Sequence, residues 1–288
     1  MLMHHIRTWP VNPGTCGTRS PWMRLSLMHY ANFIFPMLSM LAFAIPGAAA
    51  QCAAESGARR VALLELYTSE GCDSCPPVDR WISALPARGF DPERIVTLGF
   101  HVDYWNYLGW NDPFARPEYS TRQRDASRRN KARVVYTPQL LLNGADYRRG
   151  TFKDDIADRV NTINQDRPGA RISLKLVPGP TRELSVHGAV AIADATRKYG
   201  AQTYLALTEN NLANAVTSGE NHGKKLRHDF VVRSLAGPFP VGPAREAAFT
   251  HRFSLDRDWK PADLRVVSFV QNEITGDVLQ ALALPVCR

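Results

Sequence analysis

The sequence predicts two folded parts of different class, an α/β part at residues 51–168 and an all-β, sandwich-like part at residues 169–288. Up to about residue 164, short apolar runs typical of strands alternate with helix-type patterns. A turn-rich linker, Asp166–Gly169, follows, and beyond it apolar and polar residues alternate with a period of two. The length of 288 residues also fits two domains of about 100–200 residues each.

In the first part, the apolar run Arg60–Tyr67 predicts a buried strand, and a turn at Thr68–Pro77 carries residues typical of a helix start. Apolar side chains spaced as on one helical face predict a helix over Val78–Leu85. The later elements expected are a strand at Arg94–Val102, a helix at about Glu118–Arg133, a strand at Gln139–Asn143, a short strand at Tyr147–Arg149 and an amphipathic helix at Thr151–Asn164. This alternating order predicts an α/β layer.

The second part is expected to consist of strands alone. Seven segments show the period-two alternation of apolar and polar residues that is typical of strands: Arg171–Val177, Glu183–Ala191, Thr203–Glu209, Asp229–Leu235, Glu246–Phe253, Leu264–Gln271 and Val278–Leu284. Because no helical pattern separates these short strands, they predict an antiparallel sandwich.

Residues 1–50 have the composition of an export signal. They contain no Asp or Glu, and an apolar stretch at Tyr30–Ile45 is followed by small residues ending at Ala50. This order predicts a signal peptide cleaved near Ala50 and a periplasmic or secreted protein. The apolar stretch is shorter than the ~20 residues of a membrane-spanning helix, so no stable membrane span is expected after processing.

Residues 1–22 fit no signal peptide and are interpreted as an over-extended N-terminus, since Met23 or Met28 could be the start. A lipid anchor at Cys52 is disfavoured, because the preceding Gln51 is not the small residue that such processing requires.

The charge of the chain is basic, with 35 Lys+Arg against 27 Asp+Glu and a net charge of +8. Without residues 1–50 the excess falls to +5. Six cations lie within Arg122–Arg133 and could contact an anion or a lipid headgroup. An exported protein rarely meets nucleic acid, so we expect no nucleic-acid partner.

The segment Cys72-Asp73-Ser74-Cys75 is the main candidate for chemistry. It follows a predicted strand and opens a helix, so the helix dipole would favour the thiolate of Cys72. Cys75, about one turn later, would be the resolving thiol, and the two would form a disulfide. Half of a zinc site is the alternative, but the sequence has no second Cys pair for it. We expect no cofactor and no bound metal.

Thr137-Pro138 precedes a predicted strand. In thioredoxin-like folds a cis-proline in this position faces the dithiol and leaves backbone groups free to bind a peptide. An ordinary trans proline at a strand start is the alternative.

Several longer motifs are specific enough to indicate a family: Glu65–Pro77, Phe100–Trp110 with Asp112–Phe114, Tyr136–Gln139 with Asn143-Gly144, and, in the second half, Gly219–Asn221 with Leu226–Arg233. Together they resemble the domain-of-unknown-function 1223 family of exported bacterial proteins, over about Val61–Leu284. The resemblance implies a thioredoxin-like fold for the first part. It implies the function less firmly, because the family has no settled activity.

Three further residues are candidates around the dithiol. Glu65 could accept the proton of Cys75, or it could simply pair with an arginine. Trp105 and Trp110 could border a groove for an apolar substrate, with Thr137, or pack their own loop onto the domain.

Metal binding is the main rival chemistry. His101 and Asp103 could join Cys72 and Cys75 in a site suited to Cu(I). His222, His228 and Asp229 form a second, weaker candidate, since they read as residues that orient a loop. Cys52 and Cys287 could pair in an oxidising compartment if the two ends of the mature chain are adjacent.

The expected function is thiol–disulfide exchange by an oxidoreductase that uses Cys72 and Cys75. Its partners would be a protein or small-molecule thiol or disulfide and a redox partner. The alternatives are a periplasmic copper-handling protein and a non-catalytic binding module whose Cys72–Cys75 disulfide is structural.

Overall fold

The computed structural model describes residues 52–148, 154–193, 199–242 and 244–287. The expected signal peptide with its cleavage near Ala50, and the over-extended residues 1–22, lie outside the described residues. The described residues all belong to one compact unit. Within the described ranges, no helix is long and apolar enough to cross a membrane.

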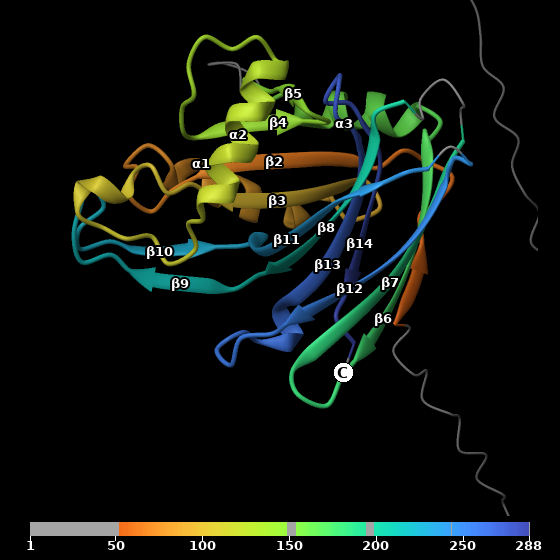
Figure 1. Ribbon diagram of the computed structural model, residues 1–288. Helices are drawn as coiled ribbons and strands as arrows, with labels where there is room; N and C mark the ends of the chain where they lie inside the picture. The colour runs from red at the N-terminus through yellow and green to blue at the C-terminus, as the bar shows by residue number, and fades with distance from the viewer. Residues whose placement is uncertain (1–51, 149–153, 194–198, 243, 288) are drawn as a thin grey trace, which may run out of the picture. The chain divides into compact units, whose positions relative to one another are not determined.

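The described ranges contain three α-helices and fourteen strands (Figure 1). The helices are α1 (Pro76–Ser83), α2 (Pro117–Arg129) and α3 (Ile156–Gln165). The strands before α3 are β1 (Ala53–Glu55), β2 (Ala62–Thr68), β3 (Ile95–His101), β4 (Gln139–Leu142) and β5 (Ala145–Asp146). Those after α3 are β6 (Ala170–Pro178), β7 (Glu183–Ile192), β8 (Ala201–Glu209), β9 (Leu212–Ala215), β10 (Lys225–His228), β11 (Val231–Pro240), β12 (Glu246–Ser254), β13 (Leu264–Asn272) and β14 (Val278–Pro285).

The strands form one mixed sheet and two antiparallel ones. The mixed sheet has eight strands in the order β14-β13-β8-β11-β3-β2-β4-β5. A four-stranded sheet has the order β1-β6-β7-β12, and β9 and β10 form a separate two-stranded hairpin. Of the residues that the structure describes, 42% lie in strands and 18% in helices.

The expected fold class is therefore wrong. The chain does not form a thioredoxin-like α/β domain followed by a β-sandwich, because the eight-stranded sheet contains strands from both sides of residue 168. The two halves join where β11 pairs with β3 in parallel, Val231 beside Gly99. The Gly99 amide donates to the Phe230 carbonyl at 2.8 Å.

Burial of the later strands explains the error. In β8 and β13 nearly every residue is buried, so both faces of these strands are covered. Strands covered on both faces belong in the interior of a sheet with layers on each side. By contrast, β6 and β7 alternate between buried and exposed positions, as expected for a sheet with one face in solvent.

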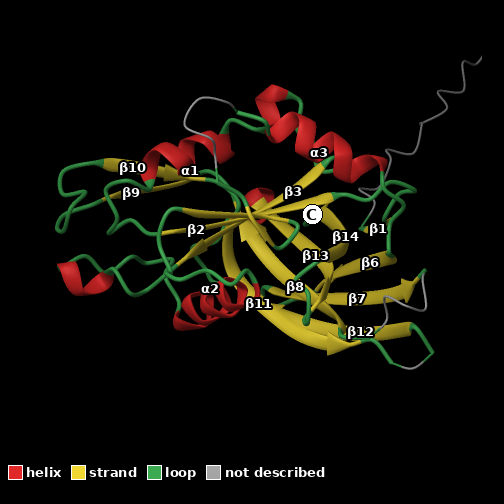
Figure 2. Ribbon diagram, turned by 90° about the horizontal axis from the view of Figure 1, so that it is seen from above, coloured by secondary structure: helices red, strands yellow, loops and turns green. Residues whose placement is uncertain are grey.

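The eight-stranded sheet is covered on both faces. On one face, Leu63 and Tyr67 of β2 and Tyr204 of β8 share a core with Tyr119 of α2. On the opposite face, Leu64 and its neighbours pack against α1 and α3, while alternate residues of β8, β13 and β14 pack against the four-stranded sheet. Figure 2 shows α1 and α3 on one side of β2 and β3 and α2 on the other. Because Cys75 begins α1, this arrangement decides which side chains of β2 can approach it.

A disulfide joins the two ends of the described unit. Cys52 and Cys287 have a Cα–Cα distance of 5.6 Å, across 235 residues of sequence. Separately, the buried Arg60 guanidinium ion-pairs with Asp166 and Asp277, which ties the segment before β2 to the start of β14.

Candidate functional site: a buried disulfide at a helix start

The Cys72–Cys75 disulfide lies between the end of β2 and the first turn of α1, as the motif predicts. The Cα–Cα distance is 5.5 Å, and the two residues are only 1% and 0% exposed. Cys75 is the N-cap of α1, and the amides of Val78 and Asp79 donate to its carbonyl oxygen. Pro76 and Pro77 occupy the first helical positions, where a missing N–H costs nothing. The sulfurs therefore lie near the positive end of α1.

The structure brings two of the predicted substrate-binding residues together. The Trp105 indole nitrogen donates to the Thr137 hydroxyl at 2.7 Å, and the Thr137–Pro138 peptide bond is cis. Trp105 also packs on the chain beside Cys72, since a Cβ on Gly71 would lie 3.0 Å from the Trp105 Cβ. The Trp105 side chain thus reaches from residues 69–75, which we call the dithiol loop, to Thr137.

The Trp110 indole makes a different contact from that of Trp105. Its indole nitrogen donates to Glu70 Oε2 at 3.0 Å, so it is held in the polar network behind the dithiol loop.

The tip of the β9–β10 hairpin, residues 216–224, covers the dithiol loop, and we refer to it as the cover loop. The Asn221 amide nitrogen donates to the carbonyl oxygens of Glu70 and Cys72, at 2.7 and 2.9 Å. Glu220 accepts from the Asp73 amide at 3.1 Å, and Lys224 donates to Asn221 Oδ1 at 2.8 Å. In Figure 1 this hairpin extends past the ends of β2 and β3, and in Figure 2 β10 runs beside α1. A segment from the second half of the chain therefore completes the site.

Glu70 is the centre of the network under the cover loop. Its carboxylate accepts from the Trp110 indole, from Asn214 of β9 and from Nε2 of His228 at the end of β10, the last at 2.9 Å. The other ring nitrogen of His228, Nδ1, lies 3.9 Å from Asp79 Oδ2 of α1. Glu70, Asp79 and His228 are all at least 96% buried. A continuous set of buried titratable groups thus connects the hairpin with the helix that carries Cys75.

A second buried pair adjoins the first. His101 Nδ1 lies 2.7 Å from Asp112 Oδ2, and the His101 ring packs edge-on to that of His228 with centroids 4.9 Å apart. Burial acts to lower the pKa of His101, but the Asp112 carboxylate raises it above its usual value. Conversely, the pKa of Asp112 is lowered: burial opposes this, and His101 with the amides of Glu70 and Phe114 outweighs it. The two groups therefore stabilise each other as an ion pair.

The metal site weighed from the sequence is not assembled. Cys72 and Cys75 are joined in a disulfide, while Nδ1 of His101 is taken by Asp112. Asp103 accepts from Ser120 instead. Across the described ranges, no group of three or more His, Cys, Asp or Glu side chains is arranged to hold a metal ion. Of the second candidate set, only His228 is buried, while His222 is exposed and Asp229 accepts from the Asn211 amide.

Glu65 lies on the wrong face of the sheet to serve Cys75. It shares the face of Leu63 and Tyr67, under α2, where its carboxylate pairs with Arg122 Nε at 2.8 Å. The Tyr67 hydroxyl also donates to it, at 3.0 Å. Because α1 covers the opposite face, these contacts support the arginine-paired alternative and not the role of a proton acceptor.

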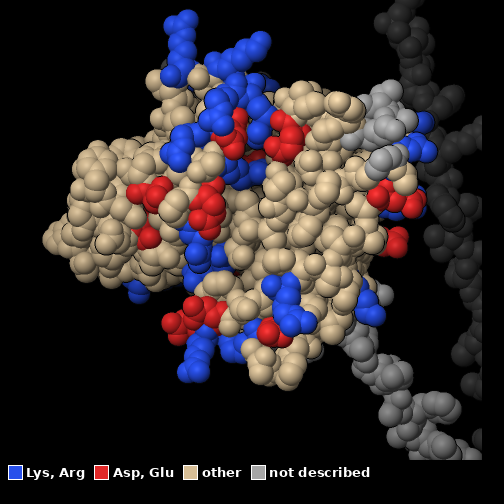
Figure 3. Space-filling view, in the orientation of Figure 1, with Lys and Arg blue, Asp and Glu red and all other residues tan. Residues whose placement is uncertain are grey.

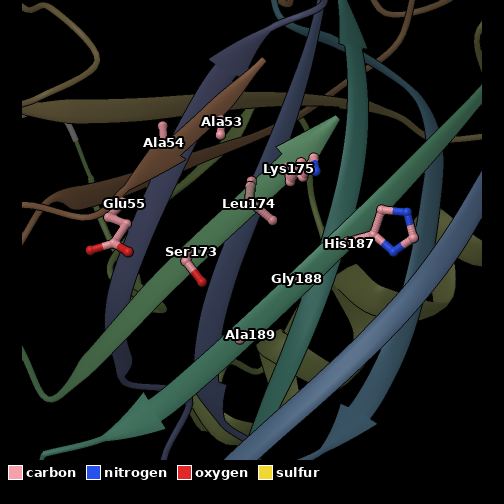
Figure 4. A pocket seen from close by; sticks show the side chains of 9 residues that line it. All are labelled: Ala53, Ala54, Glu55, Ser173, Leu174, Lys175, His187, Gly188 and Ala189. Carbon is pink, nitrogen blue, oxygen red and sulfur yellow. The ribbon is translucent and has the colours of Figure 1, made fainter. Parts of the chain in front are cut away.

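Two surface hollows illustrate what lies near the site and what does not. One, of about 470 Å³, adjoins the dithiol helix and is lined by Val78, Val134, Tyr136, Pro138, Leu140, Tyr147 and Arg148. The other, of about 550 Å³, lies on the four-stranded sheet between β1 and β7 (Figure 4). Its side chains are mostly small, with Lys175 and His187 at one end, and none belongs to the dithiol network.

The basic segment expected on α2 is divided between core and surface. Arg122 is buried, whereas Arg124, Arg128, Lys131 and Arg133 are exposed. Figure 3 shows basic side chains gathered over α2 and the loop that follows it. Arg128 pairs with Asp125 of the same helix. Arg124 and Arg128 therefore lie on a solvated face of α2, and Lys131 and Arg133 lie in the exposed segment that follows it.

Sequence reasoning missed most of the polar groups behind the dithiol. Asn221, Glu70 and Asp112 stand within the motifs that indicate the family, but a motif gives no contact between segments some 150 residues apart. Asp79 carried a weak signal, because it stands four residues after Cys75 and hence on the same helical face.

One comparison with known proteins identifies the family, and another supports the fold. The family model described as "Protein of unknown function (DUF1223)" matches residues 63–271. A crystal structure of an Agrobacterium tumefaciens protein is similar at 24% identity and a TM-score of 0.56, covering 79% of this chain and 96% of that one. The structure of HBP35 of Porphyromonas gingivalis is similar at 15% identity and a TM-score of 0.60, covering 80% of this chain and 76% of that one. Comparison with curated proteins gives no match.

At these identities the two solved structures support the fold alone. The family model spans most of the described unit, from β2 to β13, and includes the dithiol and the cover loop. The chain therefore belongs to the DUF1223 family.

Proposed function

We propose that the protein catalyses thiol–disulfide exchange through Cys72 and Cys75. The observation that carries the proposal is the position of the Cys72–Cys75 disulfide, at the N-terminus of α1 and backed by buried carboxylates and imidazoles. A helix start favours thiolate over thiol, and the thiolate is the nucleophile in exchange. A disulfide that only stabilises the fold needs neither a helix start nor buried titratable groups beside it.

In the proposed reaction, the Cys72 thiolate attacks one sulfur of a substrate disulfide. The substrate S–S bond breaks, its second sulfur leaves as a thiolate that takes up a proton, and Cys72 is left in a mixed disulfide. The Cys75 thiol then loses its proton and attacks Cys72. The Cys72–Cys75 disulfide forms and the remaining substrate thiol is released, so that the substrate is reduced by two electrons while the protein dithiol is oxidised. The reverse sequence oxidises a dithiol substrate.

The substrate class is a protein or a small molecule that carries a thiol or disulfide, together with a separate redox partner that resets the pair. Trp105, Thr137 and Pro138 supply the neighbouring surface, and the 470 Å³ hollow that contains Pro138 is its extension. Both sulfurs are buried, so a substrate reaches Cys72 only when the cover loop moves.

We also propose that the protein acts after export to the periplasm or the exterior. The export-type pattern of residues 1–50 supports this location, as does the presence of two disulfides, because disulfides persist in oxidising compartments.

Single-cysteine variants test the reaction directly. Cys72→Ser should abolish exchange with a disulfide substrate, whereas Cys75→Ser should accumulate a mixed disulfide on Cys72 that mass spectrometry detects. Cys52→Ser is the matched control, because its disulfide lies at the other end of the unit. Wild-type protein that exchanges with none of several protein and small-molecule disulfides would falsify the proposal.

A further inference from the structure

We propose that Asp79 accepts the proton of the Cys75 thiol and that His228, delivered by the β9–β10 hairpin, positions and shares that proton. This inference rests on the exchange reaction proposed above and assigns the base that its second step needs. Asp79 would be the catalytic residue of the pair and His228 a positioning residue, since His228 acts through Asp79.

The place of Asp79 on α1 puts its side chain on the same helical face as that of Cys75. The two residues are four apart, and the Asp79 amide donates to the Cys75 carbonyl oxygen at 3.1 Å, as in a regular helical turn. Side chains at this spacing share one face, with about 5–6 Å between their Cβ atoms. Cys75 is 0% and Asp79 4% exposed, so both point into the same buried layer. A carboxylate in this layer can take a proton that bulk water cannot reach.

The contacts of His228 leave one ring nitrogen free for the carboxylate. Because Glu70 accepts at 2.9 Å, the His228 Nε2 atom carries the donated proton. Nδ1 is buried and has no hydrogen-bond partner, and it lies 3.9 Å from Asp79 Oδ2. Buried nitrogens are rarely left unpaired, so an acceptor held in this position needs an explanation. A proton on the Asp79 carboxylate would explain the unpaired nitrogen, because Asp79 could then share that proton with His228 Nδ1.

The groups that face the pair come from every neighbouring element. Thr68, at the end of β2, donates its hydroxyl to Asp79 Oδ2 at 3.2 Å. Glu70 lies on the other side of His228, and His101 of β3 and its partner Asp112 lie beyond. Burial raises the pKa of Asp79 above its usual value, although His228 and His101 act to lower it. A carboxylate with a raised pKa holds a proton more firmly at neutral pH, which suits a base.

The second step moves one proton and forms one S–S bond while another breaks. In the mixed disulfide of Cys72 with the substrate, the Cys75 S–H proton passes to the Asp79 carboxylate. The Cys75 sulfur then bonds to the Cys72 sulfur, the bond between Cys72 and the substrate breaks, and its electron pair leaves on the substrate sulfur. The substrate thiolate takes the proton from the Asp79–His228 pair or from water.

Stopped-flow oxidation of the reduced full chain by 5,5′-dithiobis(2-nitrobenzoate) isolates this step. Attack by Cys72 releases the first chromophore, and resolution by Cys75 releases the second with a rate that does not depend on reagent concentration. We expect Asp79→Asn to slow the second release about tenfold or more at pH 6.5, but about twofold or less at pH 9.5, where the thiol ionises unaided. The reason is that only the low-pH reaction needs an internal base.

Two further variants separate proton transfer from packing. His228→Gln should move the midpoint of the pH profile of the second step, and Thr68→Val should move it upward, because Asp79 loses a hydrogen bond to its charged form. His187→Gln, an exposed histidine of the four-stranded sheet outside the dithiol network, is the control and should behave as wild type.

The outcomes distinguish this inference from the proposed function. Equal slowing of the second release at all pH values in Asp79→Asn, or unchanged pH profiles in all three variants, would overturn the proton-accepting role while leaving exchange intact. A wild-type protein that releases no second chromophore would overturn the exchange reaction itself.

Discussion

The Asn221 amide nitrogen donates to the Cys72 carbonyl oxygen at 2.9 Å, across 149 residues of sequence. The same nitrogen donates to the Glu70 carbonyl oxygen at 2.7 Å, and Asn221 itself is 0% exposed. One side chain thus binds both sides of the turn that presents the disulfide. This contact makes the second half of the chain part of the site, although the sequence predicts that this half is a separate domain.

Loosening the cover loop should expose the disulfide. Asn221→Ala removes both hydrogen bonds and takes its side-chain donor from the Glu70 carbonyl oxygen, while the Cys72 carbonyl oxygen keeps the Cys75 amide, at a cost of about 1–3 kcal/mol to the closed arrangement. We expect reduction of Cys72–Cys75 by a thiol reagent to become about tenfold faster, measured by trapping the freed thiols with an alkylating agent. His222→Ala, the exposed neighbour, is the control. An unchanged reduction rate in Asn221→Ala would show that the cover loop does not limit access.

Glu65 offers a contrast with Asp79, because both are buried carboxylates but on opposite sides of the sheet. Glu65→Gln should lower the free energy of unfolding, since it removes the charge partner of the buried Arg122. It should leave the pH profile of Cys75 resolution as in wild type, because α1 covers the other face. Chemical denaturation and the chromophore assay measure the two effects. A flattened pH profile in Glu65→Gln would restore Glu65 as the base.

Loss of Arg122 should be more damaging than loss of an exposed arginine of the same helix. Its guanidinium binds Glu65 and Gln271 and lies over the rings of Phe100 and Phe269. Arg122→Met should lower the free energy of unfolding by about 3–5 kcal/mol, because it leaves the Glu65 charge buried and unpaired. Arg124→Met should change it by about 0.5 kcal/mol or less. Similar values for the two variants in urea unfolding would contradict this account.

The buried Asp79 should make stability depend on pH. Its pKa is raised in the folded protein, so the folded state binds the proton more tightly than the unfolded state. The stabilisation is complete at a pH below the pKa of Asp79 in the unfolded chain, about 3.9. It is lost as the pH rises through the pKa of Asp79 in the folded protein. Asp79→Asn, which stays neutral, should therefore gain stability relative to wild type between pH 4 and pH 8. A stability difference that is constant over this range would rule out the raised pKa.

Strand positions could be predicted from the sequence, but strand partners could not. Each of the seven strands expected after residue 169 overlaps an observed one, because hydrophobic alternation is a local property. Partner choice depends on which faces are covered, and the buried positions of β8 and β13 include the polar residues Thr203, Thr208 and Ser268, so no continuous apolar run marks these strands as interior. The short β1, β9 and β10 carry too few residues for a periodic signal.

The candidate site likewise has a part that could be predicted from local motifs and a part that could not. Cys72, Cys75 and Thr137-Pro138 stand in local motifs, and the structure places them together with Trp105. The groups that complete the site, Asn221 and His228, come from the hairpin of the second half and pair with Glu70. No local pattern specifies such contacts, because they depend on how β8 and β11 deliver the hairpin to the end of β2.

The Cys52–Cys287 disulfide should act on stability alone. It closes a loop of 235 residues, and removing it as Cys52→Ser should lower the free energy of unfolding by about 2–5 kcal/mol through the larger entropy of the unfolded chain. The exchange rate at Cys72 should be unchanged below the unfolding transition. Calorimetry together with the chromophore assay tests both statements, and a loss of exchange in the folded variant would contradict the second.

The reduction potential of the Cys72–Cys75 pair tests the proposed function most directly. The protein is equilibrated with glutathione or dithiothreitol redox buffers, the thiols are trapped with an alkylating agent, and the two states are counted by mass spectrometry. Cys52→Ser/Cys287→Ser protein, measured in parallel, removes the other disulfide from the signal. A reversible potential between about −120 and −270 mV is the result that the exchange reaction predicts. A pair that stays oxidised below about −300 mV is a structural disulfide, and that result would contradict the proposal.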